Sequence, residues 1–330
     1  MNVCIVGAGA IGGFLGTRLA ARTGAAVSAL ARGATLAALQ QHGWRMQERG
    51  SLLRGPVRAA AADARQLGVQ DIVVVAVKGP ALREVAALIG PLLGDETIVL
   101  PAMNGVPWWF GYGVEALGGG ALQSVDPGGA IAAAIPQRRV IGCVVHASSE
   151  MAGPGIVAHR VGQGLIVGEP DGTESKRLRA VALLLSEAGF DVTTSTGIRR
   201  DIWYKLWGNL TMNPISAITG ATIDRVLDDP QLLEFCTAAM GEAAAIGARI
   251  GCEVGESPED RHRVTRKLGA FKTSMLQDVE AGRPIELDAI VTSVHEIGRR
   301  VGVPTPNIDI LLGLARLFGR VRGLYPAAAA

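Results

Sequence analysis

The stretch KLWGNLTMNPISAITG, residues 205–220, carries three polar side chains that could do chemistry in an otherwise apolar segment. Lys205, Asn209 and Asn213 follow one another at four-residue steps, which places them on one face of a helix. An ammonium donates hydrogen bonds and protons, and a carboxamide both donates and accepts hydrogen bonds. A single such residue would be explained as a snorkelling lysine or a structural amide. Three on one stripe favour the polar wall of a pocket.

A glycine motif near the start of the chain predicts a nucleotide-binding turn. Residues 2–6 form an apolar run, GxGxxG follows it, and a helix to about Arg22 and a strand at 26–31 come next. This order is the context that the motif needs, because its glycines permit a tight turn, a close approach to pyrophosphate and close helix–strand packing. The helix N-terminus then faces the anion. We predict cofactor contacts along this turn, from Gly7, Ala8, Gly9, Ala10, Ile11 and Gly12.

The residues after the motif indicate which dinucleotide it binds. An NAD site needs Asp or Glu about 20 residues further on, to bind the ribose 2′-hydroxyl. The first acidic residue in this chain is Glu48, and the second strand is followed instead by Arg32. A guanidinium can hold a 2′-phosphate, although Arg32 could also be an ordinary solvated arginine. The combination predicts NADP (NADPH) as the cofactor.

Two more buried strands bring polar residues to the same edge of the predicted sheet. DIVVVAVKG (71–79) ends with Lys78, and ETIVLPAMNG (96–105) ends with Asn104. Ligands of open α/β sheets collect outside the carboxyl ends of the strands. Position alone leaves open whether Lys78 and Asn104 face the cofactor or are ordinary loop residues.

The pattern then changes from strands to helices, which predicts two domains. Residues 140–168 are typical of a β-meander, and a helix at 174–188 and a strand around FDVTTS close an NADP-binding domain at 1–197. Residues 198–330 would form a helical domain. Pro284 suits the first turn of one of its helices, and nearby acidic residues complement the positive helix end. Besides the helix with the lysine stripe, we expect helices at 230–250, 259–281, 284–301 and 306–321.

Composition excludes several classes of partner. The chain has 330 residues with a formal charge of +2 and no long basic block, so nucleic-acid binding is not expected. Its apolar runs are interrupted, and its N-terminus lacks a basic segment and a cleavage site, so neither a membrane span nor a secretory peptide is expected. The scattered cysteines indicate small buried residues in a reducing cytoplasm rather than a metal or disulfide site: Cys4, Cys143, Cys236 and Cys252.

Four sequence blocks, in order, give the chain a specific resemblance. It resembles the ketopantoate reductase (2-dehydropantoate 2-reductase) family over nearly its whole length. The blocks are GAGAIGG, AMNG with Asn104, KLWGNLTMNP with Lys205, and SMLQDVEAGRPIELD with Ser274 and Glu286. The resemblance implies a Rossmann-type doubly wound sheet followed by an all-helical domain like that of 6-phosphogluconate dehydrogenase, with the active site between them.

The resemblance also implies roles for individual residues. Lys205 would be the catalytic general acid, and Glu286 would contact substrate or cofactor. Asn104 would lie between the nicotinamide ribose and a small 2-keto acid substrate. Further substrate contacts would come from Asn209, Asn213 and Ser274, and further cofactor contacts from Arg32, Lys78 and Ser148.

Two features depart from the family pattern. The family often has an asparagine after the lysine helix, where this chain has Ile223. The segment GVPWWFGYG places Trp108, Trp109, Phe110 and Tyr112 within five residues. This segment could be a packed or oligomer-contact loop, or a lid or pocket wall for a substrate larger than ketopantoate.

The functional hypothesis is NADPH-dependent reduction of a 2-keto acid to a 2-hydroxy acid. The alternatives are a catalytically silent NADP-binding sensor or scaffold, and a related reductase acting on a bulkier substrate. A homodimer is compatible with the apolar faces of the helical domain.

Overall fold

The computed structural model describes residues 1–327. Contacts divide the chain into two compact units. The first unit consists of Met1–Met103 and Gly129–Asp201, and the second of Asn104–Gly128 and the residues from Ile202 onward. The predicted division into an NADP-binding domain at 1–197 and a helical domain at 198–330 stays a prediction. Residues 104–128, which follow directly after the first stretch of the first unit, pack with helices that come much later in the chain.

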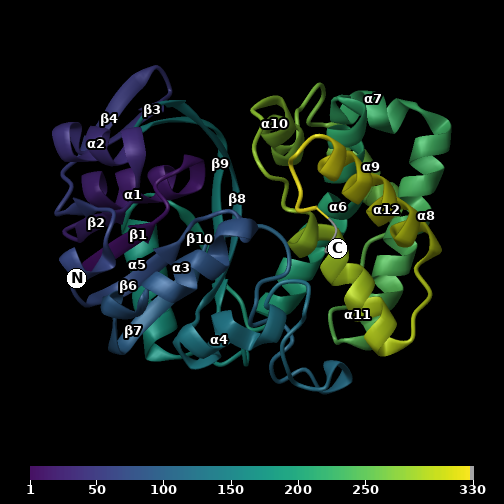
Figure 1. Ribbon diagram of the computed structural model, residues 1–330, viewed down its shortest axis with the longest axis horizontal. Helices are drawn as coiled ribbons and strands as arrows, with labels where there is room; N and C mark the ends of the chain where they lie inside the picture. Colours follow the sequence, from purple (N-terminus) through teal and green to yellow (C-terminus); the bar gives the residue numbers. More distant parts are fainter. Residues whose placement is uncertain (328–330) are drawn as a thin grey trace. The chain divides into compact units, whose positions relative to one another are not determined.

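A five-stranded parallel sheet forms the centre of the first unit (Figure 1). Its central strands are apolar runs that are buried on both faces, as parallel strands require. The predicted α/β fold class is confirmed, with shorter strands at 71–79 and 96–105 than expected. The strand order is β5 (Ala60–Ala61), β2 (Ala26–Leu30), β1 (Asn2–Val6), β6 (Gln70–Val75) and β7 (Leu93–Pro101).

A second sheet completes this unit. It has the order β10 (Asp191–Thr194), β9 (Ile156–Gly168), β3 (Trp44–Glu48) and β4 (Ser51–Gly55), and β8 (Gly142–Gly153) pairs with β9. The meander predicted at 140–168 is therefore a long two-stranded hairpin, and β3 and β4 were not predicted. Helix α1 (Ala10–Arg22) contacts strands of both sheets. Gly16 allows this, because a Cβ there would lie 2.6 Å from the Trp44 ring.

The other helices of the first unit are short. Ser175 is the N-cap of helix α5, and its side chain accepts a hydrogen bond from the Leu178 amide. It matches the helix predicted at 174–188, and β10 matches the strand predicted around FDVTTS. The helices are α2 (Gly33–His42), α3 (Leu82–Leu88), α4 (Ala130–Ala134) and α5 (Lys176–Glu187).

The second unit is helical from Ile202 onward, as predicted (Figure 1). Helix α12 has the predicted bounds, and α8 differs from its prediction by one residue. Among residues 1–327, no helix has the length and apolar character needed to cross a bilayer. The helices are α6 (Ile198–Thr219), α7 (Ile223–Asp228), α8 (Pro230–Arg249), α9 (Pro258–Arg266), α10 (Ser274–Glu280), α11 (Ser293–Val301) and α12 (Pro306–Val321).

The predicted helix at 259–281 is wrong, because the structure contains two helices there. Helix α9 ends at Arg266, and Gly269 follows with a φ of +62°, outside helical geometry. Thr273 then caps α10 by accepting a hydrogen bond from the Leu276 amide. The apolar period continues across this break, which is why periodicity alone did not show it.

The predicted helix start at Pro284 is also wrong. The Ile285 amide donates to the carbonyl of Leu324 (3.0 Å), and the backbone is not helical at residues 283–286, where a helix was expected. Helical structure begins just after Glu286, and its first regular part is a π-turn at Asp288–Thr292 that leads into α11. The four cysteines are buried thiols, as predicted.

Candidate active site

The glycine turn of the first unit has the geometry that a dinucleotide needs. Gly7 has a φ of +90°, which only glycine adopts without strain, and a Cβ on Gly12 would lie 2.0 Å from the Gly7 carbonyl oxygen. At Gly9, in contrast, no atom of the described residues lies within 4 Å of the Cβ position. Gly9 is the N-cap of α1, so this open space lies at the N-terminus of the helix. The turn therefore fits a pyrophosphate group.

The carboxyl edge of the parallel sheet gathers the basic candidates. The amide of Gly7 donates to Leu30 at the end of β2, and the amide of Ala76 donates to Val6 at the end of β1. Arg32 and Lys78 follow these positions by two residues, in loops beyond the strand ends. Ser148 lies on β8 of the second sheet, where it pairs with Val161.

Helix α6 in the second unit has its rotation fixed by two tryptophans. The indole N–H groups of Trp203 and Trp207 donate to the carbonyls of Ala243 (3.2 Å) and Met240 (2.8 Å) on α8. Both indoles are buried, so these bonds lock one face of α6 onto α8. Lys205 is two residues from each tryptophan, about 200° around the helix, and therefore lies on the opposite face.

On that face, two predicted residues from distant parts of the chain meet. The Lys205 ammonium donates a hydrogen bond of 2.9 Å to the side-chain oxygen of Asn104. Both residues are half-buried. Asn104 is in the loop after β7, and this loop belongs to the second unit. One of the three ammonium protons is thus directed at Asn104, which fixes the direction of the other two.

The loop of Asn104 is attached to the segment that follows Glu286. The Val106 amide donates to the carbonyl of Ala289 (2.8 Å), inside the π-turn. Glu286 precedes this turn and is buried, with 6% of its surface exposed. Gly105, which lies between Asn104 and Val106, has a φ of +76°, and a Cβ there would lie 2.4 Å from the Ala289 oxygen. Because π-turns recur at functional sites, this one marks the place where Asn104 and Glu286 are held.

We expect Gly105→Ala to damage this connection. Alanine disfavours a positive φ, and its methyl group would overlap the Ala289 carbonyl, so the loop must move. The expected result is a protein about 1–3 kcal/mol less stable, with kcat lowered more than the cofactor affinity. Thermal unfolding and steady-state kinetics measure the two effects. Gly113→Ala is the control, since its φ is +74° but its Cβ position is open among the described residues. Equal kinetic losses in the two variants would contradict this account.

The remaining candidates lie on α6 and α10. Asn209 is half-buried, and Asn213 is buried with 4% of its surface exposed. Three residues beyond Asn213, the hydroxyl of Ser216 lies 2.5 Å from that of Thr273, which joins α6 to the start of α10. Ser274, the first residue of α10, is held beside this contact.

The end of the described chain supports the Glu286 segment, which sequence reasoning missed. Leu324 accepts the Ile285 amide, and the Tyr325 hydroxyl donates to Asp288 (2.6 Å). Burial and the Asp288 carboxylate raise the pKa of Tyr325 to about 12, so its hydroxyl stays a donor at neutral pH. The sequence carried no local signal for these contacts, because their partners lie more than thirty residues apart.

Both departures from the family pattern are accounted for by packing. Trp108, Trp109 and Phe110 are fully buried, and the Phe110 ring lies 6.1 Å from that of Trp203. The structure thus favours a packed loop over a lid. Ile223 begins α7, is 4% exposed within an apolar cluster, and donates its amide to Phe271. Ile223 is therefore a core residue, and it does not take the place of an asparagine in the wall of a polar pocket.

The chain matches two family models, described as ketopantoate reductase PanE/ApbA over residues 3–172 and its C-terminal part over 197–318. A curated 2-dehydropantoate 2-reductase of Mesorhizobium japonicum is 45% identical over 98% of this chain and 100% of its own. A solved structure from Ralstonia solanacearum MolK2, provisionally named a ketopantoate reductase, is 57% identical with a TM-score of 0.94, over 98% of this chain and 99% of the other.

A more distant structure, a 2-dehydropantoate 2-reductase from Methylococcus capsulatus, is 26% identical with a TM-score of 0.83, over 98% of both chains. The fold is thus shared well beyond the range of high identity. The matched family is one of nicotinamide-dependent oxidoreductases. The chain therefore belongs to the ketopantoate reductase family and is an oxidoreductase that acts on a keto group.

Proposed function

We propose that the protein catalyses the NADPH-dependent reduction of a 2-keto acid, 2-dehydropantoate or a close analogue, to the 2-hydroxy acid. The observation that carries this proposal is the 2.9 Å hydrogen bond from Lys205 to Asn104, in a loop that is bonded to the segment after Glu286. It joins a proton donor to residues from two other parts of the chain. A silent cofactor-binding protein would have no use for a lysine positioned in this way.

Reduction of the keto group requires a hydride and a proton, and NADPH, when bound, supplies the hydride. Lys205 gives the proton to the carbonyl oxygen, where negative charge develops. Asn104 accepts one ammonium N–H and so directs the others. Asn209, Asn213 and Ser274 offer the amide and hydroxyl groups that bind the carboxylate and hydroxyl groups of the substrate. Glu286 contacts substrate or cofactor from the start of the π-turn.

The first unit holds the cofactor in this proposal. The glycine turn from Gly7 to Gly12 receives the pyrophosphate, and Arg32 and Lys78 supply positive charge for the 2′-phosphate. Ser148 contributes a further contact from β8. The open space at Gly9 and the two basic residues beyond the strand ends support this assignment.

NADPH consumption with a panel of 2-keto acids tests the reaction. We expect turnover with 2-dehydropantoate or a branched analogue and much weaker turnover with bulky aromatic keto acids, because the aromatic run is packed rather than free to line an enlarged pocket. The measurement is the fall of NADPH absorbance, with product identified as the 2-hydroxy acid. Tight NADPH binding without turnover of any acid would favour the sensor instead. Preferential turnover of bulky acids would favour the third hypothesis.

A further inference from the structure

The arginine proposed to bind the 2′-phosphate already has an anionic partner in this structure. The Arg32 guanidinium lies 2.7 Å from the Glu84 carboxylate, and the two side chains are 59% and 57% exposed. Arg32 follows β2, and Glu84 is in the first turn of α3, after Lys78. No sequence pattern predicts this pair, because the two residues are on separate elements.

This ion pair contributes little to folding. Exposed pairs of this kind are screened by water and salt, and most of their attraction is offset by side-chain ordering. The hydrogen bond nevertheless raises the pKa of Arg32 and lowers that of Glu84, so both groups stay charged at neutral pH. A charged pair with a minor structural role, at the carboxyl edge of a nucleotide-binding sheet, is placed to act on a ligand.

A carboxylate and a phosphate use the same guanidinium N–H donors. A 2′-phosphate that binds Arg32 must therefore take donors from Glu84 and approach its negative charge. A dinucleotide without the 2′-phosphate meets neither obstacle. We propose that Glu84 is a specificity-determining residue that competes with the 2′-phosphate for Arg32, and so keeps the preference for NADP(H) over NAD(H) smaller than Arg32 alone would give. This inference rests on the proposed cofactor assignment.

The test is calorimetric binding of NADP⁺ and NAD⁺ to the full chain and to Glu84→Gln. We expect Glu84→Gln to bind NADP⁺ about two- to fivefold more tightly at low ionic strength, the range expected for releasing an exposed ion pair. The gain should shrink as salt is added. NAD⁺ affinity should stay within about twofold, because NAD⁺ has no group that competes for Arg32.

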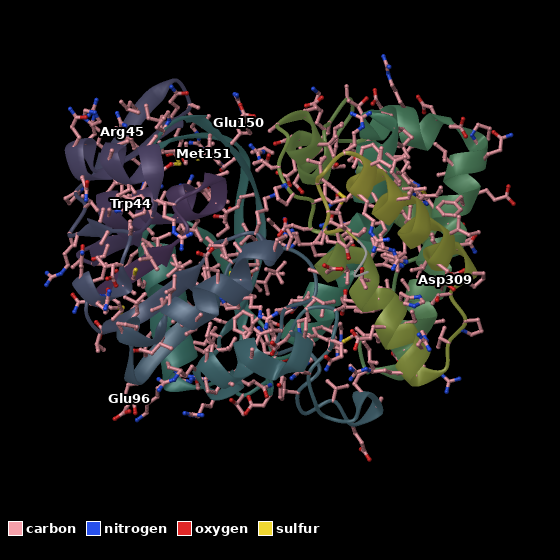
Figure 2. All side chains as sticks on the ribbon, in the orientation of Figure 1. Trp44, Arg45, Glu96, Glu150, Met151 and Asp309 are labelled. Carbon is pink, nitrogen blue, oxygen red and sulfur yellow. The ribbon has the colours of Figure 1, made fainter. Side chains whose placement is uncertain are left out.

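Two further variants separate the possible outcomes. In the Arg32→Ala background, Glu84→Gln should bring a smaller gain, because the competition for Arg32 is gone and only the repulsion between two negative charges is relieved. Glu96→Gln is the matched control: it removes one exposed carboxylate from the amino-terminal part of β7, far along the strand from the carboxyl edge (Figure 2). It should leave both affinities unchanged, and thermal unfolding checks that all variants fold.

Three results would overturn the proposal in distinguishable ways. Unchanged or weaker NADP⁺ binding by Glu84→Gln, with Arg32→Ala weakening NADP⁺ but not NAD⁺, refutes the role of Glu84 and leaves the cofactor assignment standing. An equal gain in NADP⁺ affinity in Glu96→Gln would show that the effect comes from the change in net charge. Equal weakening of NADP⁺ and NAD⁺ by Arg32→Ala removes the 2′-phosphate assignment itself, and the competition with it.

Discussion

Lys205→Ala should lower kcat by on the order of 10²–10⁴, the usual contribution of a positioned general acid. The loss arises because the reduced carbonyl oxygen would no longer receive a proton or a charged hydrogen bond as charge develops on it. NADPH affinity should barely change, since the residues proposed to bind the pyrophosphate and the 2′-phosphate lie in the first unit. Stopped-flow measurement of a single turnover isolates the chemical step from product release.

Two other substitutions sharpen this test. Lys205→Arg should restore little activity, because a guanidinium keeps the charge but does not give up a proton at neutral pH. Asn104→Ala should lower kcat less than Lys205→Ala, because it removes the group that directs the ammonium and leaves the donor. A folded Lys205→Ala protein with the wild-type rate of hydride transfer would exclude this lysine from the mechanism.

Arg32→Ala should weaken NADPH binding roughly 10- to 150-fold and leave NADH nearly unchanged, because it removes a charge-assisted hydrogen bond to the 2′-phosphate. Fluorescence titration with each nucleotide measures the two affinities. Arg179→Ala, which removes an exposed arginine of α5 in the same unit, is the control for loss of positive charge. A loss shared by NADPH and NADH would show that Arg32 supports the site without reading the phosphate.

The parts of the fold that the sequence predicted well are those governed by local rules. The turn at Gly7–Gly12 depends on one strand and one helix that adjoin it, and both were predicted. The bounds of α12 follow from Pro306 at its first position and an apolar period that continues to Val321. The stripe at Lys205 required only the four-residue step of a helix, and the structure places it opposite the tryptophans that anchor α6.

The errors occur where distant parts of the chain decide the local structure. The backbone at Ile285 is not helical, and its amide donates instead to Leu324, a contact that periodicity at 284–301 does not reveal. The ion pair of Arg32 with Glu84 was not predicted either, because Glu84 is on another element; the role of Arg32 at the 2′-phosphate stays a prediction. The aromatic run after Asn104 was left undecided, because its packing partner Trp203 follows more than ninety residues later.

The membership of residues 104–128 in the second unit has a consequence for biosynthesis. The ribosome makes about 5–20 residues per second, so Trp203 emerges roughly 5–20 s after Phe110, and Ala289 roughly 10–40 s after Gly105. The strands of the parallel sheet in the first unit, in contrast, all lie within residues 2–101 and have been made before this run. Until α6 and the π-turn exist, the run Trp108–Phe110 has no contacts with them, and unpaired aromatic surface of this kind promotes aggregation of nascent chains. The segment that carries Asn104 is therefore where a holding chaperone, or faster translation of the residues up to Ala289, would most increase the yield of folded enzyme.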